Sequence, residues 1–118
     1  GAIVCIIPAR FGSQRFPGKL LEKLKGKTVL ERTWRRAGHA EACRELVVAT
    51  DSKEIMEHVR SFGGRAVMTR SSWRSGTERV YEGWRLLEDS WRFEYVINVQ
   101  GDEPLLNPAH IDALAEQL

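Results

Sequence analysis

The sequence predicts an α/β fold, with a mostly parallel sheet and flanking helices, on the basis of three observations. Short apolar runs rich in β-branched residues alternate with segments of helical periodicity, a pattern typical of parallel sheets. The length of 118 residues suits a single domain, residues 1–118, with a core of its own. The composition, 42% hydrophobic and 29% charged, is that of a globular chain and excludes a disordered tail or a fibre.

Four buried strands are predicted from the apolar runs. The first run is continuous, as expected for a strand that is buried on both faces of a parallel sheet. A continuous run cannot alternate apolar and polar residues, so an exposed antiparallel sheet is disfavoured. In chain order the predicted strands are residues 2–7, 46–49, 66–68 and 95–99.

Each strand is followed by a helix whose start is marked by a capping residue. Thr28, Ser52 and Ser75 are suitable N-caps, Ser75 and Glu78 have the spacing of a capping box, and Asn107-Pro108 is a strong start signal. The first helix is expected to run to about residue 40, and Gly63-Gly64 should end the second. The predicted apolar faces are Leu30, Trp34 and Ala37; Ile55, Val59 and Phe62; Val80, Trp84 and Leu87; and Ile111, Leu114 and Leu118.

Three other features bound the setting of the protein. No apolar run approaches the roughly 20 residues that span a bilayer, and no leader pattern is visible, so we expect no membrane contact and a cytoplasmic location. Cys5 and Cys43 lack the spacing of a zinc site or a disulfide framework, and Cys5 is expected to be buried. Trp91 lies near helical apolar positions and is expected in the core.

The positive charge is concentrated in two short stretches. Residues 9–19 carry a net +3 and residues 69–79 a net +2, so the rest of the chain is net negative although the whole carries +2. Nucleic-acid-binding proteins usually present long basic stripes, so this pattern disfavours a nucleic-acid partner and favours a compact anion such as a nucleotide phosphate. Solvated surface arginines remain an alternative for the second stretch.

The first motif is the loop from Arg10 to Lys19, within residues 11–27, which show no periodic pattern. Glycines there allow close approach to an anion, and the loop supplies three fixed cations. It is not a Walker A loop, because Leu20 stands where the metal-binding Ser or Thr should be. A surface loop with solvated cations is the alternative.

Two further motifs follow predicted strands. Ser75–Arg79 is explained by helix capping alone, although a helix N-terminus also offers N–H groups to a ligand. Gln100–Pro104 contains an acidic pair suited to Mg²⁺, with Asp102 the better ligand, or it is a simple acidic turn. All three motifs follow strand ends, where ligands bind in open α/β sheets.

Taken together, the motifs resemble those of the 3-deoxy-manno-octulosonate (Kdo) cytidylyltransferases, from Ile3 to Leu118. The matching segments, in the same order, are Ile7–Arg10, Arg10–Lys19, Ala49–Asp51, Ser75–Arg79 and Asn98–Pro104. The resemblance implies a Rossmann-like fold of the nucleotidyltransferase type. It also implies transfer of CMP from CTP to Kdo, with Mg²⁺ and release of pyrophosphate, for lipopolysaccharide biosynthesis. A cytidylyltransferase for another sugar acid, such as an acylneuraminate, is the alternative within this class.

The resemblance also implies roles for individual residues. Arg10, Lys19 and Asp102 would act in catalysis, with Asp102 ligating Mg²⁺. Arg10, Ser13 and Lys19 would hold the triphosphate, with Arg15 near it, and Ser75, Gly76 and Arg79 would lie near the cytidine. The full set expected to bind nucleotide is Ala9, Arg10, Ser13, Arg15, Lys19, Ser75, Gly76, Arg79 and Gln100.

Members of that family are about twice as long as this chain. The chain is therefore expected to be the N-terminal, nucleotide-binding half of such an enzyme and to bind CTP without completing the reaction. A non-catalytic nucleotide-binding or assembly module is the alternative. A homodimer is expected for the full-length parent, and the shorter chain could self-associate through a poorly covered fourth strand.

Overall fold

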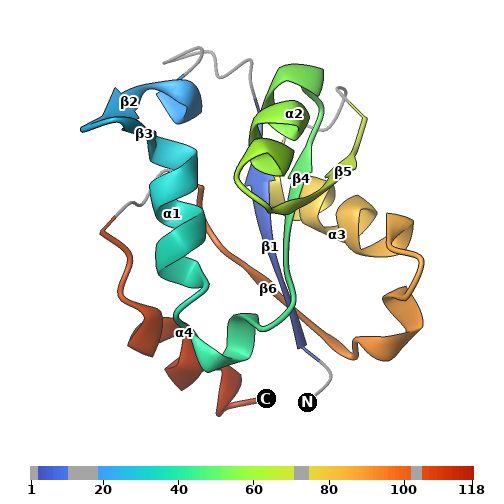
Figure 1. Cartoon of the computed structure of the whole chain (residues 1–118). Coiled ribbons are helices and arrows are strands. Elements are labelled where there is room, and N and C mark those ends of the chain that lie inside the picture. Colours follow the sequence, from blue (N-terminus) through green and yellow to red (C-terminus); the bar gives the residue numbers. More distant parts are fainter. Residues whose placement is uncertain (1–2, 11–18, 71–74, 102–104) are drawn as a thin grey trace.

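The main sheet has four parallel strands, which confirms the predicted α/β class (Figure 1). The computed structural model describes residues 3–10, 19–70, 75–101 and 105–118. The strands lie in the order β5-β4-β1-β6. Their bounds are β1 Ile3–Ala9, β4 Leu46–Thr50, β5 Arg65–Met68 and β6 Tyr95–Asn98.

Helices cover both faces of this sheet. Cys5, Ile7 and Ala9 of β1 pack in one buried cluster with residues from α1 (Val29–Ala37), α2 (Lys53–Ser61) and α4 (Pro108–Ala115). The alternate residues Val4 and Ile6 pack on the other face with α3 (Gly76–Leu86). The sheet is therefore the middle of three layers, and β1 is buried from both sides.

The four α-helices within the described ranges begin at the capping residues that the sequence predicted. The Thr28 hydroxyl accepts from the Glu31 N–H at 3.0 Å, and the Ser52 hydroxyl accepts from the Ile55 N–H at 3.2 Å. The corresponding contacts of Ser75 and Asn107, with the N–H groups of Glu78 and Ala109, measure 3.2 and 3.0 Å. Each cap satisfies an N–H group that has no partner within its helix.

A short hairpin occupies part of the segment for which no periodic structure was predicted. After a 3₁₀ turn at Lys19–Leu21, β2 (Lys23–Leu24) pairs antiparallel with β3 (Lys27–Thr28). The two turn residues both have positive φ, 53° at Lys25 and 87° at Gly26, as a two-residue hairpin turn requires. Strands of two residues are too short for an alternating pattern, and so the sequence analysis missed them.

Three predictions about helices and core need correction. The first helix ends at Ala37 rather than near residue 40. Helix α4 packs through Ile111 and Ala115, one turn apart, whereas Leu114 and Leu118 are each 55% exposed. Trp91 lies in the 3₁₀ turn Ser90–Arg92 and is 81% exposed, because that turn has no buried residue.

The two cysteines are free and buried, which confirms the expectation for Cys5. The Cys5 thiol donates to the carbonyl of Ala42 at 3.4 Å, in the 3₁₀ turn Glu41–Cys43. A hydrogen bond with the Cys43 side chain, together with burial, raises the pKa of the Cys5 thiol far above its usual range. Because the thiolate is the reactive form, Cys5 serves packing here and not nucleophilic chemistry.

Helix α3 approaches the sheet closely at Gly83. A Cβ added at Gly83 would lie 2.8 Å from the Ala49 Cβ and 3.6 Å from Cγ2 of Val67. Neither neighbour is the far end of a flexible side chain, so a larger residue would push the helix away from β4 and β5.

We predict that Gly83→Ala lowers the free energy of unfolding by up to about 2 kcal/mol, because overpacking costs about 1–3 kcal/mol and the gain in helix propensity offsets only about 1 kcal/mol of it. Gly38→Ala is the matched control, since the nearest atom to its added Cβ is 3.4 Å away. Urea denaturation followed by circular dichroism measures both. A Gly83→Ala variant as stable as Gly38→Ala would contradict the close packing.

Candidate functional site

The candidate site lies at the carboxyl ends of β1 and β6. The first three strands of the sheet run outward in the order β1, β4, β5, whereas β6 returns to the other side of β1. Ligands of open α/β sheets bind outside the carboxyl ends of the strands at such a reversal. Arg10 directly follows β1, and Gln100 closely follows β6, whose pairing with β1 extends through the Val99 N–H and the Ile6 carbonyl at 2.9 Å. The topology thus brings two of the three predicted segments together.

The N-terminus of α3 lies across the same two strand ends. A Cβ added at Gly76 would meet Cγ of Pro8 at 3.2 Å and Nδ2 of Asn98 at 4.0 Å. The first N–H groups of a helix lack partners within the helix and carry a partial positive charge. The third predicted segment therefore supplies hydrogen-bond donors beside the other two.

The Ser75 side chain is already used by the fold. Its hydroxyl accepts from the Glu78 N–H at 3.2 Å and donates to Oε1 of Glu78 at 2.9 Å. The first contact is the one that a capping box predicts; in the second, the carboxylate accepts from the Ser75 hydroxyl, whereas a full capping box has it accept from the backbone N–H of that residue. Because the Ser75 hydroxyl is already hydrogen-bonded, Ser75 and Gly76 would bind a ligand mainly through backbone groups.

Arg79 holds strand ends together. Its side chain is only 2% exposed and donates to the Thr69 hydroxyl and to the Arg70 carbonyl, the latter at 3.0 Å. The guanidinium also lies 3.7 Å from Oδ2 of Asp51, directly after β4. These contacts join α3 to the segments that follow β4 and β5, so Arg79 has a structural role here, and contact with a nucleotide stays a prediction.

The second basic stretch is partly neutralised by acids from elsewhere in the chain. The Arg70 guanidinium lies 3.6 Å from Glu82 of α3, whose carboxylate also accepts from the Arg70 N–H at 2.6 Å. Asp51 plays the same part for Arg79. Counting charge within residues 69–79 therefore overstated the positive charge available there to a ligand.

Sequence reasoning gave no role to Asp51 or Glu82. Asp51 stood in a quoted motif directly after a buried strand, and that position at the carboxyl edge was the available signal. Its other oxygen, Oδ1, is buried and has no hydrogen-bond partner within the part of the chain that is described. Glu82 carried no signal beyond its place on the same helix as Arg79.

Gly101 brings the segment after β6 against the core. It is buried, and a Cβ added there would lie 3.0 Å from Cγ2 of Ile7 and 3.6 Å from side-chain atoms of Leu20 and Leu30. The end of the first motif and the start of the third are therefore adjacent, with Lys19 and Gln100 preceding the contacting residues. The close approach explains the glycine by packing.

The structure describes seven of the predicted site residues: Ala9, Arg10, Lys19, Ser75, Gly76, Arg79 and Gln100. Ala9 is fully buried, Arg10 and Gln100 are exposed, and Lys19 is half-buried. Ser13, Arg15 and Asp102 lie outside the described residues, so the proposed triphosphate and metal contacts of these three stay predictions.

Two other features are absent from the residues described. Among them no three His, Cys, Asp or Glu side chains gather as a potential metal cluster. No helix in the described ranges is both long enough and apolar enough to cross a bilayer.

Comparison with known proteins identifies relatives over almost the whole chain. A 3-deoxy-manno-octulosonate cytidylyltransferase of Protochlamydia amoebophila is 47% identical over 118 residues, which are 100% of this chain and 46% of that protein. The mitochondrial enzyme of that name from Arabidopsis thaliana is 45% identical over 98% of this chain and 39% of its own length. The chain thus spans about half the length of the curated relatives that it matches, or less.

Solved structures agree with the sequence relatives. A CMP:2-keto-3-deoxy-manno-octonic acid synthetase, solved in complex with CTP, has a TM-score of 0.90 and 38% identity, over 99% of this chain and 47% of that one. A nucleotidyl transferase from Methanothermobacter thermautotrophicus, 23% identical with a TM-score of 0.78, covers 98% of this chain and 57% of its own and shares the fold. The cytidylyltransferase family itself matches residues 4–118, and the chain belongs to that family.

Proposed function

We propose that the chain binds CTP at the carboxyl ends of β1 and β6 and forms the nucleotide half of a Kdo cytidylyltransferase. The observation that carries the proposal is the family match over residues 4–118, with relatives of that name 43–47% identical. The reversal of strand order supports the location, because Arg10, the α3 N-terminus and Gln100 all lie there. An acylneuraminate or other sugar-acid enzyme is the alternative.

The reaction would be a single displacement at phosphorus. The anomeric hydroxyl oxygen of Kdo attacks the α-phosphorus of CTP, the bond to the pyrophosphate oxygen breaks, and the hydroxyl proton is lost. CTP and Kdo thus give CMP-Kdo, pyrophosphate and one proton. No protein nucleophile is needed, so the residues of this chain act by position and by charge, with Arg10 and Lys19 beside the triphosphate.

We propose Asp102 as the protein ligand of Mg²⁺. Carboxylate and phosphate oxygens are the hard donors that this ion prefers, and one or two protein carboxylates suffice when phosphates supply the rest. The donor chemistry therefore fits. When bound, the ion would supply charge neutralisation at the phosphates and ease loss of the hydroxyl proton. A cytoplasmic location and a homodimeric full-length protein are further parts of the proposal.

The nucleotide assignment predicts selective binding. In calorimetry with Mg²⁺, CTP should bind at least about tenfold more tightly than UTP, ATP or GTP. Arg10→Ala and Lys19→Ala should each weaken CTP binding by roughly tenfold to a hundredfold, since a hydrogen bond to a charged group contributes about 1.5–3 kcal/mol. Arg60→Ala, exposed on α2, removes the same charge away from the site and serves as the control. Equal affinity for all four nucleotides would exclude a cytidine site.

The length of the relatives predicts that the 118 residues alone do not turn over. A coupled assay of pyrophosphate release with CTP, Kdo and Mg²⁺ should give the rate seen without protein. The reason is that the proposal assigns the residues that hold Kdo to the other half of the enzyme. A fragment that binds nucleotide and shows no release would fit the proposal. Release that depends on both CTP and Kdo would show that this half is catalytically complete.

Arg79 is proposed as a positioning residue. Because its side chain is buried, we expect its truncation to destabilise the fold. Arg79→Ala leaves the Asp51 carboxylate, which is only 12% exposed, without its ion-pair partner and should lower the free energy of unfolding by about 3 kcal/mol. Arg85→Ala, exposed on the same helix, should change it by less than about 0.5 kcal/mol. Arg79→Lys keeps the charge without the fork and should fall between them. An Arg79→Ala variant of unchanged stability that no longer binds CTP would make Arg79 a ligand contact instead.

A further inference from the structure

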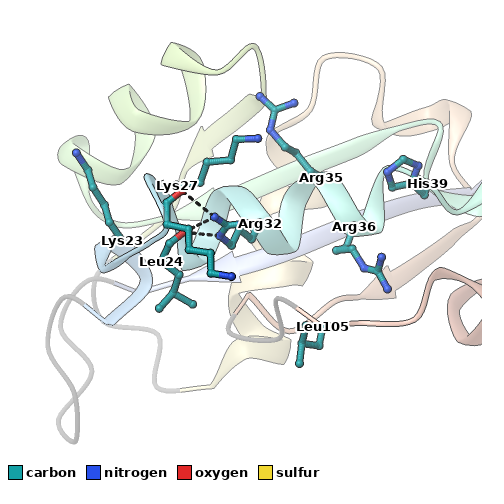
Figure 2. Close-up of a pocket in the computed structure, with 9 residues that line it drawn as sticks. Lys23, Leu24, Lys27, Arg32, Arg35, Arg36, His39 and Leu105 are labelled. Carbon is teal, nitrogen blue, oxygen red and sulfur yellow. Dashed lines mark hydrogen bonds between the residues drawn. The ribbon is translucent and has the colours of Figure 1, made fainter.

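A basic groove lies away from the candidate site, between the β2-β3 hairpin, the outer face of α1 and the segment around Leu105 (Figure 2). Its volume is about 620 Å³. The described residues that line it are Lys23, Leu24, Lys25, Lys27, Arg32, Arg35, Arg36, His39 and Leu105. Six of them carry fixed positive charge, and none of the nine is a carboxylate.

The charge pattern of the sequence did not indicate this groove. The cations of residues 23–36 are separated along the chain, and the chain outside residues 9–19 and 69–79 is net negative as a whole. The hairpin and α1 gather them on one surface. Glu31 neutralises part of this charge, because its carboxylate pairs with Arg35 at 2.7 Å.

Two arginines hold the walls of the groove in place. The Arg32 guanidinium donates to the carbonyls of Leu24 and Lys25 and so fixes the hairpin to α1 (Figure 2). Arg36 donates to the Leu106 carbonyl at 3.0 Å and fixes the opposite segment to the same helix. The groove is therefore built by side chains that join segments far apart in sequence, and it does not depend on a ligand for its shape.

The groove has the form and chemistry of a site for an extended acidic segment. From Arg32 to Arg36 the cations run along one turn of α1, about 6 Å, and the hairpin lysines lengthen the row. A single small anion could contact only part of it, and exposed charge pairs contribute little individually, so affinity requires several contacts at once. Acidic side chains spaced along a peptide would meet this requirement.

The apolar residues in the groove favour an acidic peptide over other classes of polyanion. Leu24 is 46% exposed and Leu105 is 90% exposed, and they come from opposite walls. A peptide can cover these two leucines with aliphatic side chains, whereas polyphosphate and the nucleic-acid backbone have none. No Phe, Tyr or Trp stands among the described lining residues, whereas single-stranded nucleic acids usually stack on aromatic rings. A concave surface also suits an elongated ligand better than a planar membrane.

We propose that this groove is a docking site for an acidic, leucine-containing segment of a partner protein. The proposal is independent of the nucleotide proposal, because none of the lining residues belongs to the CTP site. Association through such a surface would be fast and would weaken with added salt, since charge complementarity governs the encounter.

The test measures fluorescence anisotropy of a labelled peptide made of Glu-Glu-Leu repeats, bound to the chain. The double variant Lys23→Glu/Lys27→Glu should weaken binding by about tenfold, because it reverses two exposed charges in the groove. Lys53→Glu/Arg60→Glu, on exposed positions of α2, makes the same net change elsewhere and should change binding by about twofold or less. Circular dichroism confirms that both variants fold.

A second comparison isolates the apolar part. A Glu-Glu-Ser peptide of equal length should bind several-fold more weakly than the Glu-Glu-Leu peptide, and Leu105→Ser should remove that difference. Equal binding of the two peptides, or tighter binding of tripolyphosphate, single-stranded RNA or phosphatidylserine vesicles, would overturn the proposal in favour of a general polyanion, nucleic-acid or membrane site. Equal losses in the two double variants would overturn it as well.

Discussion

The position of β1 at the centre of the fold is the constraint on which the other features depend. It pairs with β4 along Cys5–Ala9 and with β6 along Ile3–Ile6, and its two faces pack against different sets of helices. A strand enclosed in this way must be apolar along its length, which is why its run shows no alternation. Because β6 returns to the free side of β1, the chain leaves both strands at one point on the carboxyl edge. The candidate site follows from that return.

Much of the fold was predictable because its signals are local. Each cap is a side chain bonded to a backbone N–H two or three residues away, and each parallel strand is a short apolar run. The hairpin escaped prediction because its strands are two residues long. In α4 the prediction was right for Ile111, but the small Ala115 contacts the core where Leu114 and Leu118 were expected.

The sequence predicted where the candidate site lies better than it predicted which of its cations are paired with acids. The rule that ligands bind at strand ends located Arg10, Ser75 and Gln100 together without any contact information. It could not show that Arg79 is buried, since the acid beside it, Asp51, is distant in sequence. An arginine in a motif can serve the ligand or the scaffold, and only the fold distinguishes the two.

The same reasoning separates the two basic regions of the molecule. At the carboxyl edge, Asp51 and Glu82 offset Arg79 and Arg70, so positive charge there rests on a few residues beside a helix N-terminus, an arrangement suited to a compact anion. In the groove between α1 and the β2-β3 hairpin, six cations with Glu31 as a neutralising partner are spread out and suit an extended anion. A net charge of +2 describes neither region. The charge that a ligand meets depends on which acids the fold brings to each cation, so the two proposals rest on the spatial pairing of charges more than on their number.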